Sequence, residues 1–208
     1  MKLLLIRHGQ TDWNIARRFQ GHSDIPLNQT GIKQAKALAE RLSSQHIDAL
    51  YSSDLQRTLE TAKIICKSEW HSDLLHSDSR LREINFGSWE GLTYNEIKEK
   101  YPAALAEREN DIYKNAPPNG ETLEQLCARV QSMLDELYAR HKDQAVLIVS
   151  HGGVLQILLC LALKIKPTMY WQFHLSTASL SEIALYPDGA ILNLLNDTCH
   201  LEKIIWDK

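Results

Sequence analysis

The sequence lacks the cysteine patterns that hold metals or exchange disulfides. Its cysteines lie far apart, and no two of them form a Cys-x-x-Cys pair. Isolated cysteines in apolar or helical surroundings are typical of reduced, structural thiols in a cytosolic protein. We therefore expect a cytoplasmic protein whose thiols stay reduced; they are Cys66, Cys127, Cys160 and Cys199.

The sequence also lacks a hydrophobic run long enough to cross a bilayer. Residues 3–6 are apolar, but Arg7 and His8 interrupt them before they reach the length of a signal-peptide core. The most apolar later run, residues 154–163, contains Gln156 and is far shorter than the roughly 20 residues of a spanning helix. We expect no membrane partner.

Neither sign of charge dominates the chain. It has 23 basic and 26 acidic side chains, for a net charge of −3. Because general nucleic-acid binders carry a basic excess, we expect no nucleic-acid partner. The 208 residues suffice for one substantial core, and no Gly/Ser linker, internal repeat or low-complexity tract divides them.

Strand and helix patterns alternate along the chain. Short apolar runs predict buried strands at residues 3–6, 47–51 and 145–150. Two further alternating runs, residues 179–186 and 190–195, predict a hairpin around a Pro-Asp-Gly turn. The alternation favours an α/β fold with a largely parallel central sheet and helices on both faces.

The helix patterns follow the strands. One helix is expected after Thr30-Gly31, one capped by Ser53 or Asp54, one capped by Thr122, and one over residues 154–163. Residues 66–83 show no period and are predicted to be irregular.

Residues 84–120 are predicted to form a small, mostly helical insertion subdomain. Two short helical patterns cover residues 94–101 and 103–108, with Pro102 between them, and a plain loop ends the stretch.

The chemistry is expected where two buried strands end in a histidine followed by glycine. His8 follows the first strand directly after Arg7, and His151 follows the strand at residues 145–150. Arg57 falls in the first turn of the helix after the middle strand. Because neighbouring parallel strands end on the same side, these four side chains should converge on one crevice. Two imidazoles and two guanidinium groups suit a dianionic phosphoryl group, which needs several charge-assisted donors.

Each of these residues also has an ordinary structural interpretation. His151 alone could cap a helix, and Arg57 alone could lie on a solvated helix face. A metal site is the other use for two histidines, but zinc sites typically add ligands at spacings such as His-x-x-x-His, which this sequence does not show. Two nearby arginines would also repel a dication. We therefore expect no metal and no cofactor.

Four segments together carry a resemblance to a known family. They are Arg7-His8-Gly9-Gln10-Thr11-Asp12-Trp13-Asn14, Ser53-Asp54-Leu55-Gln56-Arg57-Thr58, Leu81-Arg82-Glu83-Ile84-Asn85-Phe86-Gly87-Ser88-Trp89-Glu90-Gly91 and Val149-Ser150-His151-Gly152-Gly153. In this order and spacing they resemble the histidine phosphatase superfamily, in its phosphoglycerate-mutase-like branch. The resemblance runs from residue 1 to about residue 195. It implies that residues 1–208 form one domain of this family, with the insertion at about residues 84–120.

The resemblance also implies residue roles. His8 would be the nucleophile that becomes a phosphohistidine, while Arg7, Arg57 and His151 bind the transferring phosphoryl group. Glu83 would protonate the leaving alcohol and later activate water, a role for which Asp12 and Glu90 compete on residue type alone. The substrate-binding residues implied are Thr11, Asn14, Gln20, Gly21 and Gly152.

The expected reaction is metal-independent hydrolysis of a small phosphate monoester. In the mutases of this branch an arginine pair precedes a proline-rich turn, where this chain has only Lys114, so phosphatase is favoured over cofactor-dependent phosphoglycerate mutase. A catalytically inactive phosphate-binding scaffold is the alternative of another class.

The substrate and the oligomeric state stay open at this point. By resemblance, the substrate candidates are those of a broad-specificity phosphatase, an α-ribazole phosphatase, a phosphoserine phosphatase and a sugar-bisphosphate phosphatase. Aromatic residues of the insertion could line a pocket for a bulky alcohol or pack the subdomain's own core; they are Phe86, Trp89, Tyr94, Tyr101 and Tyr113. A monomer and a homodimer are both compatible with the sequence.

Overall fold

The apolar runs of the sequence form the middle of one six-stranded sheet. The computed structural model describes residues 1–69 and 74–202. Its strands are β1 (Lys2–Arg7), β2 (Ala49–Ser52), β3 (Leu75–Ser77), β4 (Ala145–Ser150), β5 (Leu180–Tyr186) and β6 (Gly189–Asp197). They lie in the order β3-β2-β4-β1-β5-β6. The first four in this order are parallel, and β5 and β6 are antiparallel to their neighbours. The predicted α/β class with a largely parallel sheet is confirmed.

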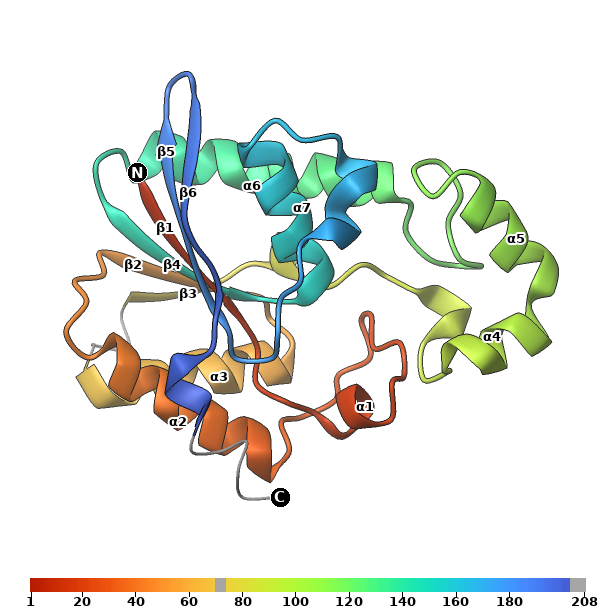
Figure 1. Ribbon diagram of the computed structural model, residues 1–208, viewed down its shortest axis with the longest axis horizontal. Coiled ribbons are helices and arrows are strands. Elements are labelled where there is room, and N and C mark those ends of the chain that lie inside the picture. Colours follow the sequence, from red (N-terminus) through yellow and green to blue (C-terminus); the bar gives the residue numbers. More distant parts are fainter. Residues whose placement is uncertain (70–73, 203–208) are drawn as a thin grey trace.

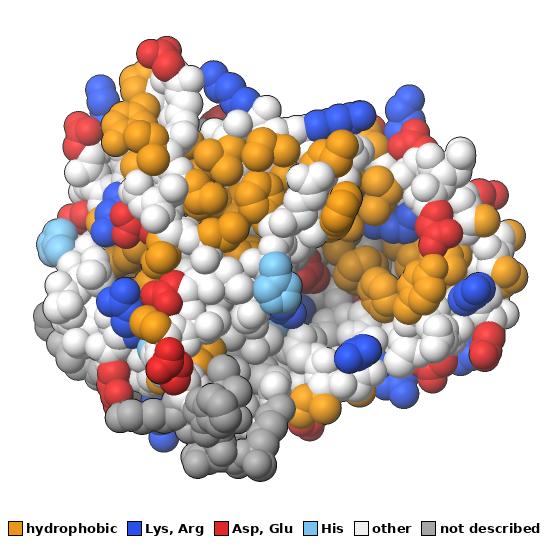
Figure 2. Space-filling view, in the orientation of Figure 1, with side chains coloured by type: hydrophobic (Ala, Val, Ile, Leu, Met, Phe, Trp, Pro, Cys, Tyr) orange, Lys and Arg blue, Asp and Glu red, His pale blue; other side chains and the backbone are white. Residues whose placement is uncertain are grey.

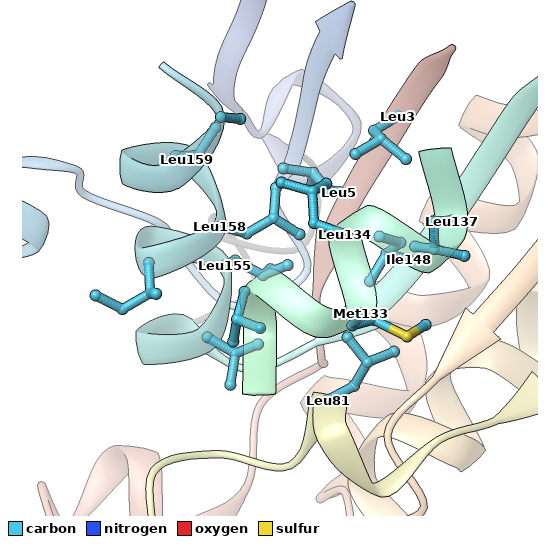
Figure 3. Close-up of a cluster of buried hydrophobic side chains, with 14 of the residues drawn as sticks. Leu3, Leu5, Leu81, Met133, Leu134, Leu137, Ile148, Leu155, Leu158 and Leu159 are labelled. Atoms are coloured by element: carbon cyan, nitrogen blue, oxygen red, sulfur yellow. The ribbon is translucent and has the colours of Figure 1, made fainter. Parts of the chain in front are cut away.

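Helices cover both faces of the sheet (Figure 1). The longer helices are α2 (Gln29–Leu42), α3 (Gln56–Glu69), α6 (Leu123–Arg140) and α7 (Gly152–Ala162). Leu4 and Ile6 of β1 point into a core shared with α2 and α3, whereas Leu3 and Leu5 point into the core under α6 and α7. Figure 3 shows Leu5 among side chains of α6 and α7. A strand buried on both faces has no polar alternation, which explains the continuous apolar run.

The remaining helical elements lie in the connections. They are α1 (Asp12–Ile15), α4 (Tyr94–Lys100), α5 (Pro102–Asn110) and the 3₁₀ turns η2 (Ser79–Leu81), η3 (Gly87–Trp89), η4 (Pro167–Gln172) and η5 (Cys199–Leu201). No helix within the described residues is both long and apolar enough to cross a membrane.

The two short helices α4 and α5 form a lobe beside the main body (Figure 1). Pro102 occupies the first turn of α5, where its missing N–H leaves no hydrogen bond unmade. The lobe has a small core of its own, made by Trp89, Ile97 and Leu105. Both helices therefore lie where the sequence predicts them.

The prediction of an irregular segment over residues 66–83 is wrong at its beginning and in its middle. Helix α3 continues to Glu69, and Leu75–Ser77 forms the edge strand β3 beside β2. A strand of three residues that is half-buried or exposed shows no apolar period, so the sequence pattern misses it. Residues 70–73 of this segment lie outside the described residues.

Two predicted boundaries also shift. Helix α2 begins at Gln29, because the side chain of Asn28 accepts a hydrogen bond of 2.9 Å from the backbone N–H of Gly31 and caps the helix. Thr30 and Gly31 therefore lie inside its first turn. Strand β2 begins at Ala49 instead of residue 47.

Candidate active site

The two strand-end histidines face each other. Arg7, the last residue of β1, pairs in register with Ser150, the last residue of β4. His8 and His151 therefore occupy equivalent positions one residue beyond the pair. Their ring centroids are 5.2 Å apart, and the ring planes meet edge to face at 62°. The predicted convergence of these histidines is thus present in the structure.

Hydrogen bonds assign opposite tautomers to the two rings. Nδ1 of His8 lies 2.7 Å from the carbonyl oxygen of Gly9, and because a carbonyl only accepts, Nδ1 carries the proton. Nε2 of His8 is then unprotonated and carries a lone pair. Nδ1 of His151 instead accepts from Nε of Arg57 at 3.2 Å, which places the proton of that ring on Nε2. This Nε2 is buried and has no hydrogen-bond partner among the described residues.

Arg57 is fully buried and held by backbone carbonyls. Its Nη1 donates to the carbonyl oxygen of Ser23 and its Nη2 to that of Gly21, each at 2.8 Å. Nη1 of Arg7 donates to the carbonyl oxygen of Leu175 at 2.6 Å, while Nε of Arg7 is buried without a partner in the described chain. Both guanidinium groups are therefore oriented without a hydrogen-bonded carboxylate.

The site favours neutral histidines beside charged arginines. Burial, and secondly the charges of Arg57 and Arg7, hold the pKa of His8 well below its usual value. Burial, and secondly the charge of Arg57, hold the pKa of His151 well below its usual value as well. Burial lowers the pKa of Arg57 to about 10, so this side chain stays charged at neutral pH. A neutral imidazole next to fixed positive charge can attack an anionic phosphoryl group.

Arg7, His8 and Arg57 line a cavity of about 160 Å³, while His151 is buried beside His8 and is not part of the lining. Its lining residues are Arg7, His8, Asn14, Arg18, Phe19, Gln20, Arg57, Glu83 and Phe86. Figure 2 shows the surface hollowed between the main body and the lobe of α4 and α5, where basic, acidic and histidine side chains meet. A larger hollow of about 490 Å³ lies at the opposite end of β1 and β4 and contains none of the predicted site residues.

Of the three competing carboxylates, Glu83 lines the cavity. Its Oε1 accepts from the backbone N–H of Ile84 at 3.0 Å, and its Oε2 from that of Gly153 at 3.3 Å. Asp12 is exposed and accepts from Asn28 at 3.2 Å. Both carboxylate oxygens of Glu90 are occupied by donors from two loops.

Comparison with known proteins identifies the family. The profile of the histidine phosphatase superfamily (branch 1) matches residues 3–198. The chain belongs to the histidine phosphatase superfamily. It is 36% identical over 201 residues to phosphoserine phosphatase 1 of Hydrogenobacter thermophilus, which covers 97% of this chain and 94% of that protein. It is 35% identical over 205 residues to phosphoglycerate mutase-like protein 4 of Arabidopsis thaliana, covering 97% and 87%.

A solved structure agrees with the sequence relatives. The α-ribazole phosphatase of Shigella flexneri superposes with a TM-score of 0.87 at 30% identity, covering 95% of this chain and 96% of that one. The predicted family, its fold and the assignment to the phosphoric monoester hydrolases of this superfamily are confirmed.

The predicted substrate-binding residues of this histidine phosphatase divide into two groups. Asn14 and Gln20 line the cavity. Thr11 is instead the N-cap of α1, where its hydroxyl accepts from the backbone of Asn14 at 3.2 Å and donates to Oδ1 of Asn14 at 3.0 Å. Gly21 offers its carbonyl to Arg57, and Gly152 begins α7 beside the side chain of Arg7. These three residues do not line the cavity. Each contacts a residue that does: Thr11 contacts Asn14, Gly21 contacts Arg57, and Gly152 lies beside Arg7.

The aromatic residues of the insertion mostly have structural positions. Phe86 lines the cavity and packs edge to face on Phe19, with ring centroids 4.8 Å apart. Trp89 and Tyr101 belong to the core of the lobe, and Tyr94 is 48% exposed. The structural interpretation therefore holds for Trp89 and Tyr101, whereas Tyr113 packs against the core of the main body.

Sequence reasoning missed Arg18 and Phe19 as cavity-lining residues. Arg18 donates to the carbonyl oxygen of Gly91 at 2.5 Å and forms an ion pair of 2.8 Å with Glu96, so contacts with the lobe place it. The only signal was their position directly before Gln20, a predicted substrate-binding residue. Within residues 1–69 and 74–202, no three histidine, cysteine, aspartate or glutamate side chains group as a metal site.

Proposed function

We propose that this chain hydrolyses small phosphate monoesters through a phosphohistidine on His8. The observation that supports it most is the pair of opposite tautomers on the two adjacent histidines. The lone pair on Nε2 of His8 can attack phosphorus, and the Nε2–H of His151 can donate to a phosphoryl oxygen. Arg7 and Arg57 supply fixed positive charge for the phosphoryl oxygens, whose charge must be stabilised in the loose transition state. The whole chain acts as one catalytic domain in this proposal, with residues 84–120 as an inserted subdomain.

In the first step, a bond forms between Nε2 of His8 and phosphorus while the bond from phosphorus to the alcohol oxygen breaks. Glu83 donates its proton to that leaving oxygen. The ring of His8 gains positive charge, which the carbonyl of Gly9 stabilises through Nδ1–H. In the second step, water attacks phosphorus, Glu83 takes the proton of the water, and the bond to Nε2 breaks. Inorganic phosphate leaves, and both residues return to their starting states.

The size of the cavity favours a compact alcohol. Pockets for drug-sized ligands measure roughly 300–1,000 Å³, whereas the site has about 160 Å³. A phosphoryl group with a small alcohol, such as phosphoserine, fits this volume better than α-ribazole 5′-phosphate. The relative named phosphoserine phosphatase supports the same choice.

The test is phosphate release from a panel of esters in EDTA, with wild type and His8→Ala in parallel. The panel contains p-nitrophenyl phosphate, phosphoserine, 3-phosphoglycerate and α-ribazole 5′-phosphate. We expect metal-independent hydrolysis that depends on His8, with higher kcat/KM for the compact natural esters. Equal rates in wild type and His8→Ala would favour the inactive scaffold. Interconversion of 3-phosphoglycerate and 2-phosphoglycerate with the bisphosphate cofactor, without net phosphate release, would favour the mutase.

A further inference from the structure

Glu90 is a carboxylate outside the cavity that ties two loops together. Its Oε1 accepts from the backbone N–H of His22 at 2.8 Å and from that of Phe86 at 3.2 Å. Its Oε2 accepts from the backbone N–H of Ser23 at 2.8 Å and from the hydroxyl of Ser23 at 2.6 Å. Four donors on one carboxylate make a strong anchor, because hydrogen bonds to a carboxylate are roughly twice as strong as those between neutral groups.

The loop that Glu90 anchors is the one that orients Arg57. The carbonyls of Gly21 and Ser23 flank His22 and accept from Nη2 and Nη1 of Arg57. Together with the bond from Nε to His151, they fix the plane of the guanidinium group. Glu90 thus acts on Arg57 through backbone carbonyls, which orient the cation but do not neutralise it as a directly paired carboxylate would.

Gly21 shows how closely the carboxylate and the loop fit. Its backbone has φ = +51°, a conformation that favours glycine, and a Cβ there would lie 2.0 Å from Oε1 of Glu90. The carboxylate therefore packs directly against the bare Cα of the residue whose carbonyl holds Arg57. A side chain at position 21 would displace either the anchor or the carbonyl.

We propose that Glu90 is a positioning residue for phosphoryl transfer, which fixes residues 21–23 and through them the orientation of Arg57. This inference rests on the proposed function. Since Arg57 stabilises charge that develops in the transition state, a loosened guanidinium should lower kcat more than it raises KM.

The test is a double-mutant cycle between Glu90→Gln and Arg57→Ala, measured as kcat and KM for phosphoserine or p-nitrophenyl phosphate. Glu90→Gln alone should lower kcat about 10- to 100-fold, the size expected for a misplacement of about 1 Å, and change KM less than about threefold. In the Arg57→Ala background, Glu90→Gln should lower kcat by less than a further factor of about three, because the guanidinium group that Glu90 positions is already absent. Added to Glu83→Gln, it should retain its full effect.

Two further variants separate positioning from folding. Ser23→Ala removes one hydrogen-bond donor to Glu90 and should lower kcat less than Glu90→Gln does. This loss should be absent in the Arg57→Ala background. If Glu90→Gln does not fold, Ser23→Ala takes its place in the cycle. Glu136→Gln is the matched control, because this carboxylate pairs with Arg80 and Arg140 away from the cavity, and it should keep wild-type kcat.

Other outcomes overturn the inference or the function separately. The positioning role would be wrong if Glu90→Gln kept the wild-type kcat. It would also be wrong if the losses in kcat from Glu90→Gln and Arg57→Ala multiplied in the double variant. Neither result would affect the proposed phosphatase activity. Coupling to Glu83 in place of Arg57 would overturn the positioning role too. A wild-type protein without phosphatase activity would overturn the proposed function itself.

Discussion

The two walls of the cavity are built in different ways. One wall consists of strand ends and helix starts, where β1 and α3 bring His8 and Arg57 together, with His151 at the end of β4 behind His8. The other wall consists of loops and the lobe, which supply Gln20, Glu83 and the ring of Phe86. The register of a buried sheet fixes the two histidines of the first wall, whereas loop carbonyls orient its Arg57. Hydrogen bonds between segments far apart in the chain fix the second wall.

The two walls serve different parts of the proposed substrate, the phosphoryl group and the alcohol. Groups that touch the phosphoryl group must be held within a fraction of an ångström, and rigid sheet ends achieve this better than loops. Groups that meet the alcohol can vary with the loops as long as the carbonyls of Gly21 and Ser23 keep Arg57 in place. We therefore expect substitutions in the strand-end wall to abolish turnover, and substitutions in the loop wall to lower it less or to change selectivity.

Arg57→Ala should have the largest effect among the side chains that we propose to bind the phosphoryl group. Loss of a buried guanidinium that stabilises a transferring phosphoryl group should lower kcat by about 10³- to 10⁵-fold. Arg57→Lys should recover only part of this loss, because a lysine restores the charge but not the planar fork. Steady-state kinetics of both variants measure the effect.

Arg80→Ala is the matched control for this prediction. Arg80 pairs with Asp78 and Glu136 and does not line the cavity. Its kcat should stay within about threefold of wild type, because the residue is away from the cavity and surface ion pairs contribute little to the stability of the fold. Equal losses in Arg57→Ala and Arg80→Ala would remove the distinction between the two kinds of arginine.

Glu83→Gln tests the loop wall and should come next in size. Replacing a general acid that also activates water should lower turnover by about 10²- to 10⁴-fold. Asp12→Asn should lower it about tenfold or less, because Asp12 is exposed and outside the cavity. If Asp12→Asn proved the more damaging change, the assignment of Glu83 as acid would be wrong.

The same difference explains what the sequence could predict. His8 and His151 follow short apolar runs that predict buried strands, so their convergence follows from parallel pairing. The position of Glu83 follows from no local pattern: Arg129 donates to its carbonyl at 3.0 Å and His22 at 3.0 Å. These contacts join loops whose relative position has no period in the sequence, and a family resemblance was needed to choose Glu83.

The predicted role of Thr11 shows a further limit of sequence patterns. The motif places Thr11 near the phosphoryl site, but its hydroxyl is used within α1, where it caps the helix and holds Oδ1 of Asn14. Capping and ligand binding favour the same residue types, so the sequence does not separate them. The amide nitrogen of Asn14 is the group left to meet a ligand.

Buried neutral histidines in the strand-end wall should make stability depend on pH. The pKa values of His8 and His151 are lowered in the folded protein, so below about pH 6.5 the unfolded chain binds more protons. Stability should be constant in this respect above about pH 6.5 and fall below it, by up to about 1.4 kcal/mol per histidine per pH unit.

Urea unfolding at pH 5.5 and 7.5 measures this slope. The double variant His8→Asn, His151→Asn should lose the part of the slope that these two histidines cause. An unchanged slope in that variant would show that other groups produce the acid sensitivity.

Phe86→Ala should have the smallest effect and sharpens the comparison between walls. The ring lines the cavity and packs on Phe19, a contact worth about 0.5–1.5 kcal/mol, so KM should rise about three- to tenfold with kcat nearly unchanged. Tyr94→Ala is the control, because Tyr94 is exposed on the lobe. A collapse of kcat in Phe86→Ala would mean that Phe86 also positions the phosphoryl group.

Trapping the covalent intermediate tests the central claim most directly. The enzyme is mixed with a phosphoryl-labelled ester, quenched within milliseconds in alkali, and mapped by mass spectrometry. We expect an acid-labile phosphoryl group on Nε2 of His8, because Nδ1 donates its proton to the carbonyl of Gly9, and no label in His8→Ala. A phosphoryl group on Nδ1 of His8, on His151 or on any other residue would contradict it.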